Sequence, residues 1–277
     1  MKKIKLTNGI LILMLVAGLS LLIYPSFSDW WNSFHQTQAI AVYTETVQKM
    51  DNESYAEYWT AAADYNARLL KRNSNFAATD AQKKEYNKLL NIEDNGVMAY
   101  IEIPAIKCYL PIYHGTDEAV LQVAIGHLEW SSLPVGGESS HCVVSGHRGL
   151  PSAKLFSELN HLEEGDTFML HVLDETLTYE VDQILIVEPH EVQALKIEEG
   201  KDLCTLVTCT PYGINSHRML VRGHRTDNAP VQLEFRVTAD AVQIEPMLIA
   251  CFLVGPAVLI GIVMIFAFDG AKKRKKS

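Results

Sequence analysis

The residues with the clearest chemical potential lie in one stretch, residues 205–225, which reads TLVTCTPYGINSHRMLVRGHR. Cys209 closes an apolar, strand-like run, and Pro211 and Gly213 follow it at once in a predicted tight turn. A thiol at such a junction can face a groove. Cysteine is also among the most often buried residue types, so its position alone favours an inert core thiol.

A cysteine nucleophile needs a base or a cationic neighbour, because a free thiol with a pKa of about 8.5 is only slightly ionised at neutral pH. His147 is the candidate base. It follows another apolar run and lies between Gly146 and Gly149, which allow a sharp turn and the close approach of a substrate. A histidine at a strand end is commonly a structural group, so this assignment depends on the presence of Cys209.

A cationic candidate, Arg218, follows Cys209 by nine residues. A strand, loop and second strand of that length can bring the two side chains together. A guanidinium there could donate hydrogen bonds to a substrate carbonyl and to the oxyanion formed on attack. The spacing does not exclude the other arginines nearby, which are Arg148, Arg222 and Arg225.

Together, TLVTC, the arginine nine residues later and SGHRG some sixty residues earlier resemble the catalytic pattern of sortases, cysteine transpeptidases on the surface of Gram-positive bacteria. The resemblance covers residues 97–225, and TLVTCTPYGINSHR is similar to class C, the pilin-polymerising type. It implies that Cys209 is the nucleophile, His147 the general acid and base, and Arg218 the stabiliser of substrate and tetrahedral intermediate. It also makes Thr208 a candidate for positioning the substrate.

The resemblance also implies a fold, a substrate and a reaction. The fold is the eight-stranded sortase β-barrel. The family recognises pilins by a C-terminal LPxTG-like motif, cleaves after its threonine and holds the acyl group as a thioester. A lysine amine of the next pilin subunit then takes the acyl group and forms an isopeptide bond. No cofactor is expected, and the sequence has no CxxC or Cys/His spacing typical of a zinc site.

The elements that must position these residues show strand periodicity after Gly96. Apolar and polar residues alternate at 100–103 and at 177–182. Further short apolar runs, separated by turn signals, occur at residues 108–113, 141–145, 168–172, 184–187, 203–209 and 219–221. Many short strands with little helix between them favour a sandwich or a closed barrel. We therefore predict a mainly β catalytic domain over residues 96–227.

A helical preface is predicted at residues 29–95. Apolar spacing is helical from 36 to 70, and Thr79 with Gln82 forms a capping-box pattern that opens a short helix to about residue 90. Many class C sortases have a lid over the active site with an Asp-Pro-aromatic motif. The equivalent loop here, residues 72–82, reads RNSNFAATDAQ, and the chain contains no Asp-Pro pair. Phe76 is the candidate for plugging the site instead.

Two uncharged apolar blocks, residues 6–28 and 247–268, flank the rest of the chain. A helix over the second block would be roughly 33 Å long, enough to cross a bilayer core. Basic residues lie outside both blocks, so both termini should be cytoplasmic and the middle external. We predict an N-terminal signal anchor at 1–28, a stalk at 228–246, and a transmembrane helix with a basic tail at 247–277.

The first block leaves an alternative open. Its strongly apolar part, residues 10–23, also suits a signal peptide, and Ser26-Phe27-Ser28 would be an acceptable cleavage site. Pro25, Trp30 and Trp31 resemble an interfacial belt instead, which favours an uncleaved anchor. Either outcome exports the middle of the chain.

The net charge and the number of cysteines limit which partners and disulfide bonds are expected. The chain of 277 residues has a net charge of −9, and the part between its basic ends carries 32 acidic and 16 basic residues. Such acidity argues against nucleic acid as a partner. With five cysteines, an exported protein retains at least one unpaired thiol.

Two other functions share these features. A membrane-anchored cysteine peptidase would use the same residues but let water resolve its acyl-enzyme. A non-enzymatic surface scaffold would keep Cys209 buried and inert.

Overall fold

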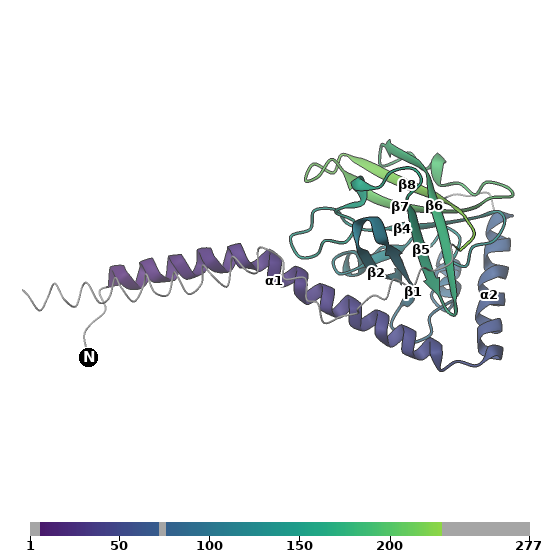
Figure 1. The fold of residues 1–277 in the computed structure, drawn as a ribbon, viewed down its shortest axis with the longest axis horizontal. Helices are drawn as coiled ribbons and strands as arrows, with labels where there is room; N and C mark the ends of the chain where they lie inside the picture. Colours follow the sequence, from purple (N-terminus) through teal and green to yellow (C-terminus); the bar gives the residue numbers. More distant parts are fainter. Residues whose placement is uncertain (1–5, 72–75, 229–277) are drawn as a thin grey trace, which may run out of the picture. The chain divides into compact units, whose positions relative to one another are not determined.

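The computed structural model describes residues 6–71 and 76–228 (Figure 1). The predicted second membrane helix at 247–277, all but the first residue of the predicted stalk at 228–246, and Cys251 lie outside the described residues. The chain divides into two compact units, and the unit that carries the β-barrel begins at Asp29.

Three helices precede the barrel: α1 (Leu6–Gln48), α2 (Asn52–Leu70) and α3 (Asp80–Tyr86). The helix predicted over 36–70 is interrupted at Asp51, whose side chain accepts a hydrogen bond from the Ser54 amide and starts a new helix. The predicted capping box of Thr79 and Gln82 is confirmed at the start of α3. This helix ends at Tyr86, short of the predicted residue 90.

The first helix contains one stretch long and apolar enough to cross a membrane, and none of that stretch is buried. This property fits a signal anchor and a signal sequence equally. Helix α1 continues past the apolar stretch without a break as far as Gln48.

Eight strands form the predicted closed barrel, in the order β1-β2-β3-β4-β7-β8-β6-β5. Their bounds are β1 Val97–Ile103, β2 Cys108–His114, β3 Ile125–His127, β4 Ser140–Ser145, β5 Thr167–Val172, β6 Glu175–Val187, β7 Asp202–Thr210 and β8 His217–Arg225. Short helical turns α4 (Glu118–Leu121), η1 (Pro104–Ile106), η2 (Leu159–His161) and η3 (Gln193–Leu195) lie in the connections. The prediction missed β3 and divided β6 into two runs.

The three strands that carry the candidate residues are neighbours in this barrel. Strand β4 pairs in parallel with β7, and β7 pairs antiparallel with β8. Because side chains alternate between the faces of a strand, Cys142 and Cys204 lie in the barrel core, whereas Val143, Val207 and Leu220 pack in a separate cluster on the outer face.

The preface helices cover other parts of the barrel. Ala62 and Tyr65 of α2 and Tyr86 of α3 belong to the main hydrophobic core, and α2 flanks the barrel in Figure 1. The buried Tyr43 hydroxyl of α1 donates to the Met98 carbonyl and accepts from the Leu173 amide. These contacts make the preface an integral part of the folded unit.

Candidate active site

Strand pairing places Cys209 and Arg218 directly opposite each other in β7 and β8. Directly opposed residues of an antiparallel pair have their side chains on the same face of the sheet. The nine-residue spacing therefore spans the end of β7, the turn and the first residues of β8. Both side chains are half-buried, on the outer face of the barrel.

His147 reaches the same place from β4. Ser145 pairs with Val207 in the parallel register, so two more residues along each strand align His147 with Cys209. This alignment continues beyond the end of β4, because the Gly146 amide donates to the Val207 carbonyl at 3.0 Å. Three neighbouring strands thus bring His147, Cys209 and Arg218 into one row.

The surroundings of His147 leave its ring free for chemistry. Its Nε2 atom is buried and has no hydrogen-bond partner among the described residues. Gly146 is required for this arrangement, because an added Cβ would lie 2.7 Å from Ile125 Cγ2 and 2.8 Å from Phe156 Cδ2. The backbone can therefore pass close to the core just before it presents the imidazole.

Thr208 lies on the opposite face of β7 from Cys209. Its buried hydroxyl donates to the Gly146 carbonyl at 2.8 Å and so links β7 to the segment that leads to His147. This contact is structural. A role of Thr208 in substrate positioning stays a prediction.

The other arginines near Cys209 are engaged elsewhere. Arg148 donates from Nε, Nη1 and Nη2 to Ser157, Thr210 and Asn160. The Arg222 guanidinium forms ion pairs with Asp182 and Glu198, and Arg225 donates to the Thr178 carbonyl and lies near Asp202.

Arg218, by contrast, has no carboxylate partner in the described part of the chain. Its Nη1 atom donates to the carbonyls of Asn215 and His217, at 3.3 and 3.2 Å, in its own loop. Nitrogens of the same guanidinium thus remain to bind a substrate oxygen.

An apolar cluster lies on the same face of the barrel as Cys209. Val143, Val207, Leu220 and Leu195 are its buried members. Partly buried side chains pack around them, namely Leu128, Trp130, Leu185, Val187, Val192 and Ala194. These partly buried side chains give an extended peptide apolar surface to contact.

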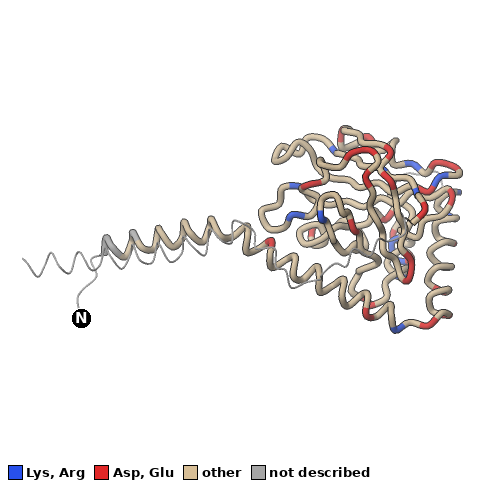
Figure 2. Tube along the Cα trace, in the orientation of Figure 1, with Lys and Arg blue, Asp and Glu red and all other residues tan. Residues whose placement is uncertain are grey.

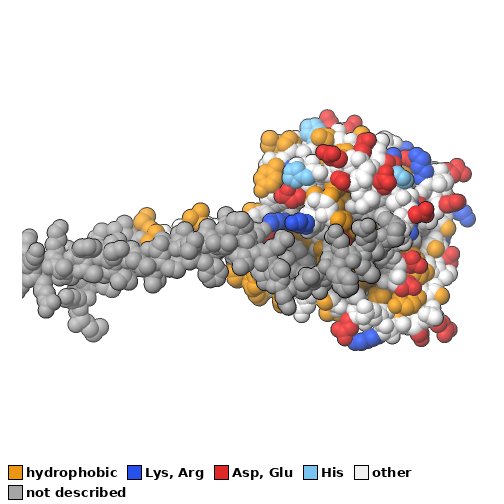
Figure 3. All heavy atoms as spheres, in the orientation of Figure 1, with side chains coloured by type: hydrophobic (Ala, Val, Ile, Leu, Met, Phe, Trp, Pro, Cys, Tyr) orange, Lys and Arg blue, Asp and Glu red, His pale blue; other side chains and the backbone are white. Residues whose placement is uncertain are grey.

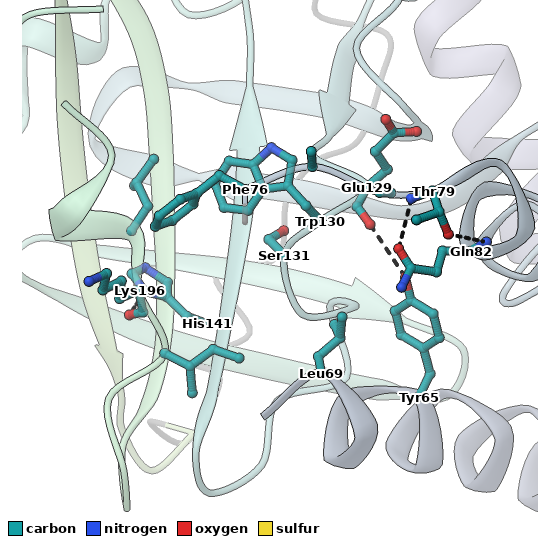
Figure 4. A pocket seen from close by; sticks show the side chains of 14 residues that line it. Tyr65, Leu69, Phe76, Thr79, Gln82, Glu129, Trp130, Ser131, His141 and Lys196 are labelled. Atoms are coloured by element: carbon teal, nitrogen blue, oxygen red, sulfur yellow. Dashed lines mark hydrogen bonds between the residues drawn. The ribbon is translucent and has the colours of Figure 1, made fainter. Parts of the chain in front are cut away.

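A pocket of about 330 Å³ adjoins this cluster and includes Phe76, Trp130 and Leu195 (Figure 4). The Phe76 and Trp130 rings meet edge to face with centroids 5.2 Å apart. The described ring contact of Phe76 is thus with Trp130, and its role as a plug over Cys209 stays a prediction. The polar side of the pocket includes His141, whose Nδ1 contacts the Lys196 carbonyl and whose Nε2 contacts the Thr205 hydroxyl.

The sequence did not single out Trp130 or Leu195. Neither lies in a periodic apolar run, and each reaches the outer face from a connection rather than a strand. A large aromatic residue between turn residues was the available signal for Trp130.

The remaining cysteines provide an internal comparison for Cys209. Cys142 and Cys204 oppose each other in the core and are only 2% and 0% exposed. Burial raises the pKa of Cys204. Burial also opposes ionisation of Cys142, but hydrogen bonds with Cys204 and His127 outweigh it and hold the Cys142 pKa below its usual value. Burial raises the pKa of Cys108 to about 12.

We therefore expect one fast-reacting thiol in the barrel unit. In the full chain carrying Cys251→Ser, iodoacetamide at neutral pH should modify Cys209 at least about tenfold faster than the other three cysteines, because theirs are inaccessible or protonated. Peptide mass spectrometry of the native protein measures this. Equal labelling of Cys209 and Cys108, or no labelling before unfolding, would favour the scaffold function.

Comparisons with known proteins agree with this geometry. The sortase domain family matches residues 101–226. Sortase C1 from Streptococcus agalactiae is 49% identical, with a TM-score of 0.68, over 69% of this chain and 100% of that one. Sortase C of Streptococcus pneumoniae, whose structure concerns catalysis and pilin substrate specificity, is 47% identical, with a TM-score of 0.63, over 70% and 100%.

A third structure contains the C-terminal cell wall sorting motif. It is sortase C of Clostridium perfringens, 43% identical with a TM-score of 0.62, over 69% of this chain and 100% of that one. A curated sortase of Bacillus subtilis, 32% identical over 128 residues, is matched over 62% of its own length.

Proposed function

Because this chain belongs to the sortase family of cysteine transpeptidases, we propose that it joins pilin subunits, by cleaving an LPxTG-like motif and transferring the acyl group to a lysine. One observation carries the proposal. The registers of β4, β7 and β8 align His147, Cys209 and Arg218 in a single row beside an apolar cluster of the outer face. The likeness to class C sortases supports the choice of pilin as substrate.

In the first step, the Cys209 thiolate attacks the threonine carbonyl carbon of the motif. Charge develops on the carbonyl oxygen, where the guanidinium of Arg218 donates hydrogen bonds. The C–N bond to glycine then breaks. Protonated His147 gives its proton to the departing glycine amine, and the acyl group remains on sulfur as a thioester.

In the second step, the amine of a pilin lysine attacks the thioester carbonyl. His147, now neutral, accepts a proton from the amine, and the C–S bond breaks to restore the Cys209 thiolate. The product is an isopeptide bond. Both bonds exchanged are acyl bonds, so the transfer requires no external energy source.

The apolar face beside Cys209 suits the leading residues of an LPxTG-like motif. Leucine and proline side chains would pack on the partly buried Leu185, Val187 and Trp130, while the threonine carbonyl lies at Cys209. The neighbouring pocket at Trp130 offers further apolar surface. The structure of the Clostridium perfringens relative with the C-terminal cell wall sorting motif supports this class of substrate.

In this proposal the enzyme is anchored in the membrane, with the barrel outside the cell and both termini inside. The apolar stretch of α1 supports an N-terminal anchor, and Trp30 and Trp31, 52% and 50% exposed, fit an interfacial belt. Figures 2 and 3 show acidic positions spread over the barrel unit and mixed with neutral side chains in the view shown. A lysine-bearing acceptor therefore meets a mildly attractive surface rather than one acidic site.

A transfer assay tests the proposal. The full chain in detergent micelles is incubated with an LPxTG-type peptide and with a pilin domain that contains its acceptor lysine. We expect an isopeptide-linked product by mass spectrometry, and its loss when that lysine is changed to arginine. Hydrolysed peptide with no linked product would favour the peptidase, and neither product would favour the scaffold.

A further inference from the structure

The loop that follows His147 is closed upon itself. The Phe156 amide donates to the His147 carbonyl at 3.1 Å, which joins the two ends of the loop. A second bond lies nearby, because the Gly149 amide donates to the Ser157 hydroxyl at 3.1 Å. The backbone that presents the imidazole is thus continuous with a compact loop over residues 147–156.

Two side chains of α1 hold the far end of this loop. The Asn32 amide nitrogen Nδ2 donates to the Ser152 carbonyl at 2.8 Å. The Asp29 carboxylate oxygen Oδ1 accepts from the Lys154 amide at 2.8 Å. Asp29 and Asn32 are three residues apart, so they lie on one face of α1.

These two hydrogen bonds from α1 matter because no hydrogen bond to the buried Nε2 atom, among the described residues, orients the His147 ring. The direction of the imidazole therefore depends on the backbone of its loop. A displacement of about 1 Å in a reacting group can cost about 10²-fold in rate.

We propose that Asp29 and Asn32 are positioning residues for His147, which hold the loop 147–156 against α1 and so set the place of the imidazole beside Cys209. This inference rests on the proposed function of His147. Asp29 is the first residue of the folded unit and directly follows the uncharged residues 6–28 of the sequence. The loop of the catalytic histidine is therefore held by side chains from the part of α1 that begins the folded unit.

Gln36 is a control on the same helix face. One turn further along α1, its Nε2 atom donates to the Val123 carbonyl. Val123 lies between α4 and β3, away from the loop that carries His147. If the bonds of α1 merely docked the helix on the barrel, the loss of Gln36 and the loss of Asn32 would have similar effects.

The test uses four variants of the full chain in detergent micelles. Asn32→Asp keeps the side-chain shape but removes the donor, and Asp29→Ala removes the acceptor. Both should lower kcat for peptide transfer about tenfold, with KM within about twofold of the parent. Asp29→Asn, which keeps an acceptor oxygen, and Gln36→Ala should retain kcat within about twofold.

Amide hydrogen exchange of the same variants gives a second measurement that needs no sorting activity. Exchange in residues 147–156 should be at least about tenfold faster in Asn32→Asp and Asp29→Ala than in Asp29→Asn and Gln36→Ala. An inactive parent protein with this exchange pattern would defeat the proposed function but not the holding of the loop.

Three outcomes would overturn the inference: an unchanged kcat in both Asn32→Asp and Asp29→Ala, equal losses in Gln36→Ala, or global unfolding of both loop variants. Global unfolding would show that these bonds support the whole barrel rather than the loop.

Discussion

Replacing Cys209 by alanine should abolish the thioester and lower transfer at least about 10³-fold, because no other side chain in the row can act as the nucleophile. Strand pairing puts Cys209 opposite Arg218 and in line with His147, on the outer face of the barrel. The measurement is the amount of isopeptide-linked product together with the mass of a trapped acyl-enzyme. The variant should bind the motif peptide with an affinity close to that of the parent.

Cys204→Ala is the matched control for this experiment. Cys204 lies in the same strand, five residues earlier, but is buried in the core and opposes Cys142. Its loss should lower the free energy of unfolding by about 1 kcal/mol and leave transfer nearly unchanged. If Cys209→Ala polymerised pilin as well as Cys204→Ala did, Cys209 would not be the nucleophile.

Arg218→Lys should lower kcat/KM about 10²-fold, and Arg218→Ala about 10³-fold. A guanidinium offers several donors in a fixed plane, whereas an ammonium on a flexible chain cannot bind the oxyanion and the loop carbonyls in the same geometry. Arg218 already donates to the carbonyls of Asn215 and His217, so its side chain is held near the turn that follows Cys209. Single-turnover kinetics of thioester formation would locate the loss in the first step.

Arg222 provides the contrast, because it lies on the same strand and face. Its guanidinium is bound to Asp182 by two hydrogen bonds, at 2.9 and 3.0 Å, and to Glu198. Arg222→Lys should lower stability by about 1 kcal/mol and leave kcat/KM within about twofold. A loss of activity equal to that of Arg218→Lys would mean that general destabilisation, not the oxyanion, explains both.

Local patterns predicted most of the barrel but not all of it. Strand β3 has only three residues, Ile125–His127, and Gly126 in its centre weakens any strand signal. The close approach of two chain segments requires that glycine, since an added Cβ would lie 2.0 Å from the Gly115 carbonyl oxygen. Strand β6 reads as two runs because its register with β8 shifts between Val181 and Gln183, which changes the alternation of faces.

Part of the candidate site could likewise be predicted from local sequence, and part could not. The spacing of Cys209 and Arg218 is local, so it could be found in the sequence, and their pairing follows from one turn. The alignment of His147 depends on the parallel pairing of β4 with β7, a contact between segments some sixty residues apart. Single-sequence periodicity does not report such contacts, so His147 was a candidate from its strand-end position and flanking glycines, and the family resemblance linked it to Cys209.

The apolar contacts of the outer face could not be predicted from local sequence. Trp130 and Leu195 come from connections that cross the outer face, and their contacts with Val143 and Val207 exist only once the barrel has closed. In the lid-equivalent region, the capping box of Thr79 was visible in the sequence, but the contact of Phe76 with Trp130 was not.

The opposed pair Cys142 and Cys204 links the stability of the barrel core to the alignment of the candidate active site. Each lies five residues before a candidate catalytic residue, His147 on β4 and Cys209 on β7. If the strands slipped by one residue, side chains of the inner face would turn outward, and the core would lose its packing. A misaligned active site would therefore occur only in a barrel too unstable to persist. Changes to this inner layer would therefore be expected to impair the alignment of the candidate catalytic residues as well as stability.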